Sequence, residues 1–447
     1  MGGLILTFTS AIVVGHRTVT EPSEKINRLD FGHPPETIEF WQHRARESLA
    51  LTPAPLYVFA SSPVAERLAE LEAELVAAGF RTASANLKSP LGFRHWLSFK
   101  TQPLRPLLNW WRGQGRPIEV VSAFELRAAL AEGFAPENIL VNGPAKQPWL
   151  SSFELPGLSV NFDSAAEAEA LLPLAKKHGW RLGVRILTSQ EFDPENPASP
   201  TQFGLEPDAA VLLLKKLMAA QARVETVHFH LRTNVSAVHI FEQAIAEVAG
   251  VCRAAQFNPL HLDVGGGVPV RHVRSRGSKV YDGEFGLRSF ARMLRQSVKA
   301  MPSLQEVWLE NGRFLTAGSG ALVVKILEVK ERRGLRQLIC DGGRTLHAIT
   351  SVWEQHALIP LETHTSPEVL TVVHGPTCMA FDQLARIPLP RSLSPGDHLI
   401  WLDAGAYHLA WETQFSHGHA AICWQDEAGL RVVRPHQTFA DWWGQWE

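Results

Sequence analysis

Short runs rich in β-branched and aromatic residues recur between Leu56 and Asn311, and amphipathic helical segments separate them. This alternation predicts parallel strands joined by crossover helices. The eight runs fit a closed (β/α)8 barrel of the TIM type, in which reactive side chains collect at the C-terminal ends of the strands. The runs are HWLSF, PIEVV, NILVN, LSVNF, RLGVRI, VETVHFHL, LHLDV and EVWLE.

One connecting segment shows how such a crossover helix is built. Ser62 provides an N-cap, Pro63 suits the first turn, and Gly79 ends the helix. A second helix is predicted from about residue 236 to 255. The apolar stripe of the first helix consists of Val64, Leu68, Leu71 and Leu75.

After about Gly318 the pattern changes to alternating β-branched and aromatic residues with Gly and Pro turns, which predicts an antiparallel β domain. At 447 residues the chain is also longer than a single core usually supports. We therefore predict an N-terminal segment at residues 1–50 that packs with the β domain, a barrel at residues 51–318, and a C-terminal β domain at residues 319–447.

Composition and charge exclude several partners. The formal net charge is only −2, so the basic surface that attracts nucleic acid or anionic lipid is missing from the global balance. The four cysteines show no CxxC spacing and predict free thiols in a reducing compartment. The apolar stretch GGLILTFTSAIVVG has no basic residue before it, so we favour a strand or two over a signal peptide or membrane helix. We expect a cytoplasmic protein that binds neither nucleic acid nor membrane.

Two segments place polar chemistry directly after predicted strands. In LDVGGGVPV, Asp263 ends a strand and Gly265, Gly266 and Gly267 follow. Backbone amides in such a loop approach an anion closely, so the loop predicts a phosphate site at the barrel mouth, with a plain turn as the alternative. In WLENGRF, Glu310 ends the last run; Arg313 lies three residues beyond, and a surface ion pair is the alternative.

Two further candidates have common structural explanations when taken singly. Lys100 in SFKTQP follows a strand, where partial burial lowers a lysine pKa toward the range in which imines form. Most such lysines are solvated loop residues. In HFHL, His230 lies at a strand end, with His228 beside it and expected to point the other way. Most histidines on strands are structural.

Taken together and in this order, these segments resemble the fold-type III pyridoxal-phosphate decarboxylases, the family of diaminopimelate and ornithine decarboxylases. The resemblance covers about residues 55 to 445 and implies an alanine racemase-like barrel, a C-terminal β domain and pyridoxal 5'-phosphate as cofactor. Lys100 then stands where the family has its Schiff-base lysine, in motifs such as A-V-K-A-N. Glu310 and Arg313 match E-P-G-R, in which Glu binds the pyridine nitrogen and Arg the phosphate. Asn311 replaces the usual Pro.

The resemblance implies further cofactor contacts. Glu119 and Ser122 match the family's D-V-V-S-x-x-E-L stretch, and Lys146 ends NGPAK as in its G-x-x-K. HFHL resembles H-F-H-[I/V]-G-S, which assigns His230 to the face of the cofactor ring. DAGAYHLAWETQFSHG resembles G-A-Y…F-N-G, which turns Tyr407 toward the cofactor. The residues assigned to the cofactor are Lys100, Glu119, Ser122, His230, Thr233, Gly265, Gly266, Gly267, Glu310, Arg313 and Tyr407.

HGPTCMAFD resembles G-P-T-C-[D/E]-x-x-D, whose Cys reaches the active site of the neighbouring subunit. Cys378 is thereby the candidate acid that returns a proton to Cα after carbon dioxide leaves. Lys100, Cys378 and His230 are the predicted catalytic residues, in a homodimer whose two active sites are shared across the interface. Arg232 and Thr233 depart from the family, which has Gly and Ser there, and Arg232 is an added candidate for a phosphate or substrate-carboxylate contact.

The departures bear on the substrate. Diaminopimelate decarboxylases carry an acidic residue after the catalytic Cys and an R-P-x-L-Y stretch; here Met379 follows Cys378, and residues 350–353 occupy the approximate place of the second motif. A methionine leaves a distal ammonium without a partner, at a cost of several kcal/mol. We assign Arg232, Met379 and Asp382 to the substrate. Trp110, Trp111 and Trp353 are candidates, with Met379, for an apolar wall, and plain packing is the commoner alternative.

We predict a decarboxylase of an amino acid or amino-acid derivative, free or carrier-tethered, in a specialised pathway and acting on neither diaminopimelate nor ornithine. A racemase on the same fold and an inactive regulatory homologue are the alternatives. The retention of Lys100, Glu310, Arg313 and Cys378 argues against the inactive homologue. GPTC and Glu310 argue against the racemase. No metal site is expected.

Overall fold

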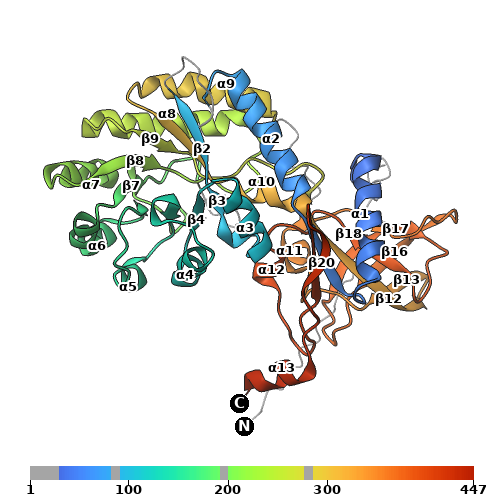
Figure 1. Ribbon diagram of the computed structural model, residues 1–447. Coiled ribbons are helices and arrows are strands. Elements are labelled where there is room, and N and C mark those ends of the chain that lie inside the picture. Colours follow the sequence, from blue (N-terminus) through green and yellow to red (C-terminus); the bar gives the residue numbers. More distant parts are fainter. Residues whose placement is uncertain (1–29, 82–90, 192–199, 276–284, 447) are drawn as a thin grey trace, which may run out of the picture.

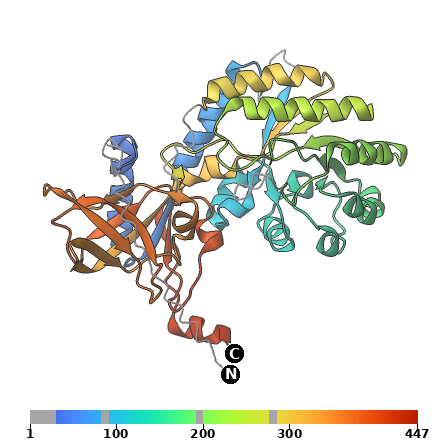
Figure 2. The ribbon, with the colours of Figure 1, turned by 180° about the vertical axis from the view of Figure 1, so that it is seen from behind.

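The computed structural model describes residues 30–81, 91–191, 200–275 and 285–446. The stretch GGLILTFTSAIVVG lies outside these residues. Two bodies lie side by side, a barrel wrapped by helices and a β domain (Figure 1, Figure 2). Each is built on a nine-stranded sheet. Among the described helices, none has both the length and the apolar character to cross a membrane.

The first sheet is parallel throughout and forms the predicted barrel, in the order β2-β11-β9-β8-β7-β6-β5-β4-β3. Its two ends, β2 (Gly92–His95) and β3 (Leu97–Ser98), are separated in the chain by Trp96 alone, so the ring closes through one residue. All eight predicted runs contribute strands. The others are β4 (Ile118–Val120), β5 (Ile139–Val141), β6 (Ser159–Phe162), β7 (Arg181–Arg185), β8 (Val224–His228), β9 (His261–Asp263) and β11 (Glu306–Leu309).

Helices between the strands cover the barrel (Figure 1). α2 (Ser62–Ala77) buries the predicted stripe of Val64, Leu68, Leu71 and Leu75, and α8 (Val238–Ala255) is the second predicted helix. The remaining helices of this part of the chain are α3 (Arg105–Gly113), α4 (Ala123–Ala131), α5 (Gln147–Leu150), α6 (Ala165–His178), α7 (Pro207–Ala219), α9 (Leu287–Ser297) and α10 (Gly312–Thr316). The 3-10 turns are η1 (Phe99–Thr101), η2 (Pro136–Asn138), η3 (Val298–Ala300) and η4 (Ala317–Ser319).

The second sheet is mostly antiparallel and contains the strands from the C-terminal half of the chain. It also pairs two strands in parallel fashion, β13 with β16. Its strands from this half are β12 (Gly320–Arg332), β13 (Leu335–Cys340), β15 (Leu358–Pro360), β16 (Glu368–His374), β17 (Gln383–Pro390), β18 (His398–Trp401), β19 (Ala421–Asp426) and β20 (Gly429–Arg434). Outside both sheets, β10 (Arg274–Ser275) pairs with β14 (Glu354–Gln355), and the short helices are α11 (Ala348–Val352), α12 (His408–Trp411), α13 (Phe439–Trp443) and η5 (Gly444–Trp446).

The ninth strand of this sheet is β1 (Leu56–Ala60), which falls within the range 51–318 that we assigned to the barrel. β1 pairs antiparallel with β12 and parallel with β19, so it belongs to the β domain. All five of its residues are buried. A wholly apolar run does not reveal which sheet will bury it, which explains the misplacement. α1 (Pro35–Leu49) packs against β1, β18 and β20. The proposed division at residues 50 and 318 itself stays a prediction.

Candidate active site

The amine of Lys100 lies at the barrel mouth, in η1 directly after β3. It donates to Oγ of Ser98 at 2.7 Å and to Oε2 of Glu119 at 2.9 Å. Burial lowers the pKa of Lys100, but the charge of Glu119, with smaller contributions from Tyr407 and Glu310, outweighs burial and leaves that pKa above its ordinary value. The lysine therefore carries a proton in this arrangement, contrary to what burial alone predicts.

Ser122 is the N-cap of α4, where its Oγ accepts from the amide of Glu125 at 3.2 Å. The carboxylate of Glu125 accepts a hydrogen bond from the amide of Val121 at 2.8 Å. Burial, followed by the nearby charge of Glu119, raises the pKa of Glu125 to about 7. Ser122 thus has a structural task on the same side of the mouth as Glu119, and its predicted contact with the cofactor stays a prediction.

A buried polar network supports Glu310, which follows β11 and is 4% exposed. Asn142 donates to Oε1 of Glu310 at 2.5 Å. Asn161 donates both to Oδ1 of Asn142, at 2.9 Å, and to Oδ2 of Asp263, at 3.0 Å. We did not single out the two asparagines from the sequence, although the signal was present, because each lies at the C-terminal end of a predicted run, NILVN or LSVNF.

The two histidines of HFHL both lie beside these carboxylates. Nδ1 of His230 is 3.7 Å from Oε2 of Glu310, and Nδ1 of His228 is 3.2 Å from Oδ2 of Asp263. The expectation that His228 points away is wrong, because a spacing of two residues on a strand puts both side chains on one face. Burial lowers the pKa of His228 to about 4 and also lowers that of His230, while burial raises the pKa of Asp263 to about 6. Both imidazoles are neutral near pH 7.

The glycine loop after β9 has no room for side chains. A Cβ at Gly265 would lie 2.5 Å from Nδ1 of His230, and one at Gly266 would lie 2.9 Å from the carbonyl oxygen of Glu310. A Cβ at Gly267 would lie 3.0 Å from the carbonyl oxygen of Arg232. The backbone therefore borders the site directly, as a phosphate-binding loop requires.

Arg313, on α10, is held against two residues of the β domain. Its Nη1 donates to Oε1 of Glu354 at 2.6 Å, and its guanidinium lies 4.7 Å from the ring centre of Tyr407. Nε of Arg313 is buried and has no hydrogen-bond partner among the described residues. The amide of Tyr407 donates to the carbonyl of Thr101 at 2.6 Å, next to Lys100. The β domain therefore forms one wall of the barrel mouth.

Other predicted residues lie at the margins of this arrangement. Arg232 is half-buried and Thr233 is exposed, on the segment after β8. Lys146 is fully buried, with its amine 2.6 Å from Oε1 of Glu167, so it forms an internal ion pair of its own. Trp111 is buried and donates to the carbonyl of Pro117, as a packing residue does. Of the other tryptophans of the suggested apolar wall, Trp110 is half-buried. Trp353 is exposed, and its ring lies edge-on to that of Trp411.

The loop between β16 and β17 carries Cys378, whose side chain is exposed, and Met379, which is half-buried. Asp382 is 2% exposed and holds this loop together. Its Oδ1 accepts from the amide of Arg344 at 2.8 Å, and its Oδ2 accepts from Oγ1 of Thr377 at 2.6 Å. In a single chain Asp382 is thus bonded to its own loop and to the segment after β13, and its predicted contact with substrate stays a prediction.

The residues at the mouth fit pyridoxal 5'-phosphate. Lys100 provides an amine for covalent attachment, and Glu310 provides a buried carboxylate for the pyridine nitrogen. The loop at 265–267 offers backbone without side chains, and the unpartnered Nε of Arg313 offers a buried donor, so both suit the phosphate. The neutral imidazole of His230 suits the face of the ring.

Comparisons with known proteins agree with this fit. Residues 80–317 match the family model for the pyridoxal binding domain of pyridoxal-dependent decarboxylases. The chain is 27% identical over 363 residues to the diaminopimelate decarboxylase of Actinosynnema pretiosum subsp. auranticum, covering 76% of this chain and 80% of that one. It is 24% identical over 365 residues to the diaminopimelate decarboxylase of Zymomonas mobilis, covering 79% and 83%.

Solved structures show the same fold. The diaminopimelate decarboxylase of Helicobacter pylori, complexed with L-lysine, matches with a TM-score of 0.74 and 20% identity, over 90% of this chain and 98% of that one. The lysine/ornithine decarboxylase of Vibrio vulnificus, complexed with cadaverine, matches with a TM-score of 0.71 and 19% identity, over 86% and 98%. The predicted barrel with its β domain is confirmed.

Proposed function

The chain belongs to the pyridoxal-dependent decarboxylases, and we propose that it removes the α-carboxylate of an amino acid that lacks a distal ammonium group. One observation above all supports decarboxylation: the Lys100 amine and the Glu310 carboxylate lie at the same barrel mouth. Both are needed for a cofactor that is attached through an imine and kept protonated on its ring.

When bound, the cofactor supplies an electron sink that allows the bond between Cα and the carboxylate to break. In our proposal, Glu310 holds a proton at the ring nitrogen, and Asn142 fixes the orientation of that carboxylate through its 2.5 Å bond. Glu119, 2.9 Å from the Lys100 amine, is positioned to take a proton from it. Arg313 and the glycine loop bind the phosphate. His230 covers the ring.

We further propose a homodimer in which Cys378 of one subunit returns a proton to Cα in the site of the other. The exposed position of Cys378 in a single chain supports this assignment, because a thiol that serves a partner's site must lie on the surface. The described cysteines are unpaired, which supports a cytoplasmic location.

The substrate proposal rests on Met379, which occupies the place where the family has an acidic residue. Several relatives are named for diaminopimelate, which carries a second ammonium group, so that compound is the main competitor. An apolar, carboxylated or carrier-tethered amino acid, from a specialised pathway, avoids the cost of leaving an ammonium unpaired beside Met379.

A screen of amino acids for carbon dioxide release by the purified protein tests the proposal. The panel includes diaminopimelate, ornithine and lysine beside apolar and dicarboxylic amino acids. Fastest turnover of an apolar or a dicarboxylic amino acid supports the proposal. Fastest turnover of diaminopimelate contradicts the substrate assignment but not the assignment as a decarboxylase. Exchange of the α-proton without carbon dioxide release would indicate a racemase, and an absence of cofactor absorbance would indicate an inactive homologue.

A further inference from the structure

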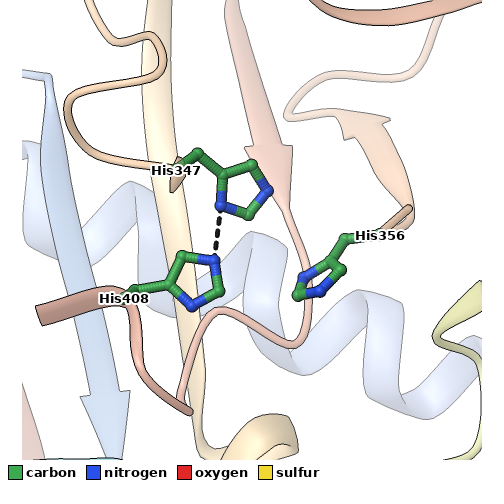
Figure 3. A group of neighbouring side chains, drawn as sticks. All are labelled: His347, His356 and His408. Carbon is green, nitrogen blue, oxygen red and sulfur yellow. Dashed lines mark hydrogen bonds between the residues drawn. The ribbon is translucent and has the colours of Figure 1, made fainter. Parts of the chain in front are cut away.

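Three buried histidines meet in the β domain, next to the wall of the active site. His347 precedes α11, His356 follows β14 and His408 begins α12 (Figure 3). They are 0%, 4% and 1% exposed. One ring nitrogen of each lies within 4.8 Å of those of the other two. Three separate segments of the chain therefore deliver imidazoles to one place, which a local sequence pattern does not explain.

The hydrogen bonds fix where two of these rings carry their protons. Nδ1 of His408 lies 3.0 Å from the carbonyl of Ala406, and Nδ1 of His356 lies 3.1 Å from the carbonyl of Leu402. A carbonyl only accepts, so each Nδ1 carries the hydrogen. With Nδ1 of His408 donating to a carbonyl, Nε2 of that ring is left to act as an acceptor or a metal ligand. Metal-binding histidines are commonly oriented in this way, with the other nitrogen donating to a backbone carbonyl.

The Nε2 atoms of His408 and His356 each lie close to a further atom that is able to bind a metal ion. Nε2 of His408 lies 2.5 Å from Nδ1 of His347, closer than an ordinary hydrogen bond, and the rings are stacked at 4.5 Å (Figure 3). Nε2 of His356 lies 3.0 Å from Oε2 of Glu354. Three imidazoles and the carboxylate of Glu354, all of them buried, thus lie close together.

We propose that His347, His356 and His408 bind a divalent transition-metal ion such as Zn²⁺, with Glu354 as the neighbouring carboxylate. Imidazole ligands select ions of this class over Mg²⁺ and Ca²⁺, which prefer oxygen. This site departs from our expectation from the sequence that the chain holds no metal.

The metal ion also has a structural consequence for the active site. His408 directly follows Tyr407, and Glu354, bonded to His356, accepts from Arg313. A bound ion would tie these segments together and fix the wall that Tyr407 and Glu354 form against Arg313. We therefore expect it to act as a structural ion, positioning residues rather than touching substrate.

Chain without an affinity tag, loaded with cofactor and then freed of metal with a chelator, provides the test. Zn²⁺ and Mg²⁺ are titrated separately, and bound metal and the Tm are measured. We expect one Zn²⁺ per chain, no comparable uptake of Mg²⁺, and a rise in Tm of about 5 °C with Zn²⁺. A wild-type chain that binds no Zn²⁺ in stoichiometric amount, with the same Tm in its presence and absence, overturns the proposal.

Two variants locate the ion. His408→Gln should weaken Zn²⁺ binding about tenfold or more and abolish the Tm shift. His417→Gln, an exposed histidine in the same stretch of chain, should behave as the wild type. Equal Zn²⁺ binding by His408→Gln and wild type contradicts the assignment. Since neither readout uses decarboxylation, the result is independent of the proposed function, and the wild-type titration stands even if a variant folds poorly.

Discussion

Oε2 of Glu119 lies 2.9 Å from the amine of Lys100 and at the same time accepts a 2.5 Å bond from Oγ of Ser98. The three side chains come from the neighbouring strands β3 and β4 and the turn that follows β3. A lysine attacks a carbonyl only as the neutral amine, so a buried carboxylate in contact with it is a ready proton acceptor. Glu119 thus stabilises the charged form of Lys100 and can also accept the proton that must leave before the amine reacts.

Replacing Lys100 should abolish covalent attachment of the cofactor. In Lys100→Ala we expect no cofactor adduct that borohydride can reduce, and a lower Tm because Glu119 loses its cationic partner. Lys100→Arg is the matched control, since it keeps the positive charge but forms no imine; it should lose the adduct and retain more of the Tm. A reducible adduct in both variants would place the attachment elsewhere, with Lys146 the first alternative.

Glu310→Gln should bind the cofactor but lose turnover by about a hundredfold or more. The amide oxygen still accepts the bond from Asn142, so the network and the fold are preserved, but a neutral amide does not hold the ring nitrogen protonated. Cofactor absorbance and kcat are the two measurements. A kcat near that of the wild type would contradict the role assigned to Glu310.

The sequence predicts those site residues whose neighbours follow from the order of the strands, but not the contacts between residues that are far apart in the chain. Lys100, Glu310 and the glycine loop were found because each directly follows a strand, and the topology of a parallel barrel brings strand ends together. Arg313, three residues after Glu310, was assigned through the resemblance of this stretch to E-P-G-R. Its actual partner, Glu354, lies 41 residues away on a strand of a separate pair, and only the folded chain brings them into contact.

The same reasoning explains what was missed. Asn142 and Asn161 matter through a chain of hydrogen bonds across three strands, and the histidine cluster draws on three segments of the β domain. Each asparagine lies at the end of a predicted run, but the sequence does not indicate the hydrogen bonds that link them, and the three histidines show no local spacing at all. β1 was misplaced for a related reason, because its five buried residues suit either sheet and the choice depends on strands far along the chain.

Acid should destabilise the protein partly through His95. Burial, and then the charge of Arg116, lowers the pKa of His95 to about 3, below its ordinary 6.5. Between these values the unfolded chain binds more protons than the folded one, so the stability is fully present above pH 6.5 and is lost as the pH falls, by about 1.4 kcal/mol per pH unit. Tm measured at pH 7.5 and 5.5 should fall less in His95→Gln than in the wild type. Equal falls would show that this histidine does not contribute.

Mixing inactive subunits tests the shared site. If Cys378 serves the partner's site, Lys100→Ala and Cys378→Ala chains, inactive alone, should recover about a quarter of wild-type activity after subunit exchange, because half of the dimers are mixed and each has one intact site of two. The exchange itself is verified with differently sized labels. Demonstrated exchange without recovery would assign Lys100 and Cys378 to the site of one subunit.

Met379→Asp should provide the ammonium partner that is missing. We expect kcat/KM for ornithine or lysine to rise about tenfold relative to the best native substrate, the ratio given by about 1.4 kcal/mol. Met379→Asn, similar in size but uncharged, should not show the rise. Efficient ornithine decarboxylation by the wild type would mean that another acid, such as Glu354 or Asp341, reads the distal amine.

The pairing of β1 with β12 and β19 makes the barrel an insertion within the β domain. From the end of β1 at Ala60 to the start of β12 at Gly320 the ribosome adds 260 residues, which takes roughly 13 to 50 s at about 5–20 residues per second. Throughout that interval β1, an interior strand of the second sheet, has neither of its neighbouring strands, and its buried apolar side chains must be shielded from water in another way. The part of the protein that begins first is therefore the part that is completed last.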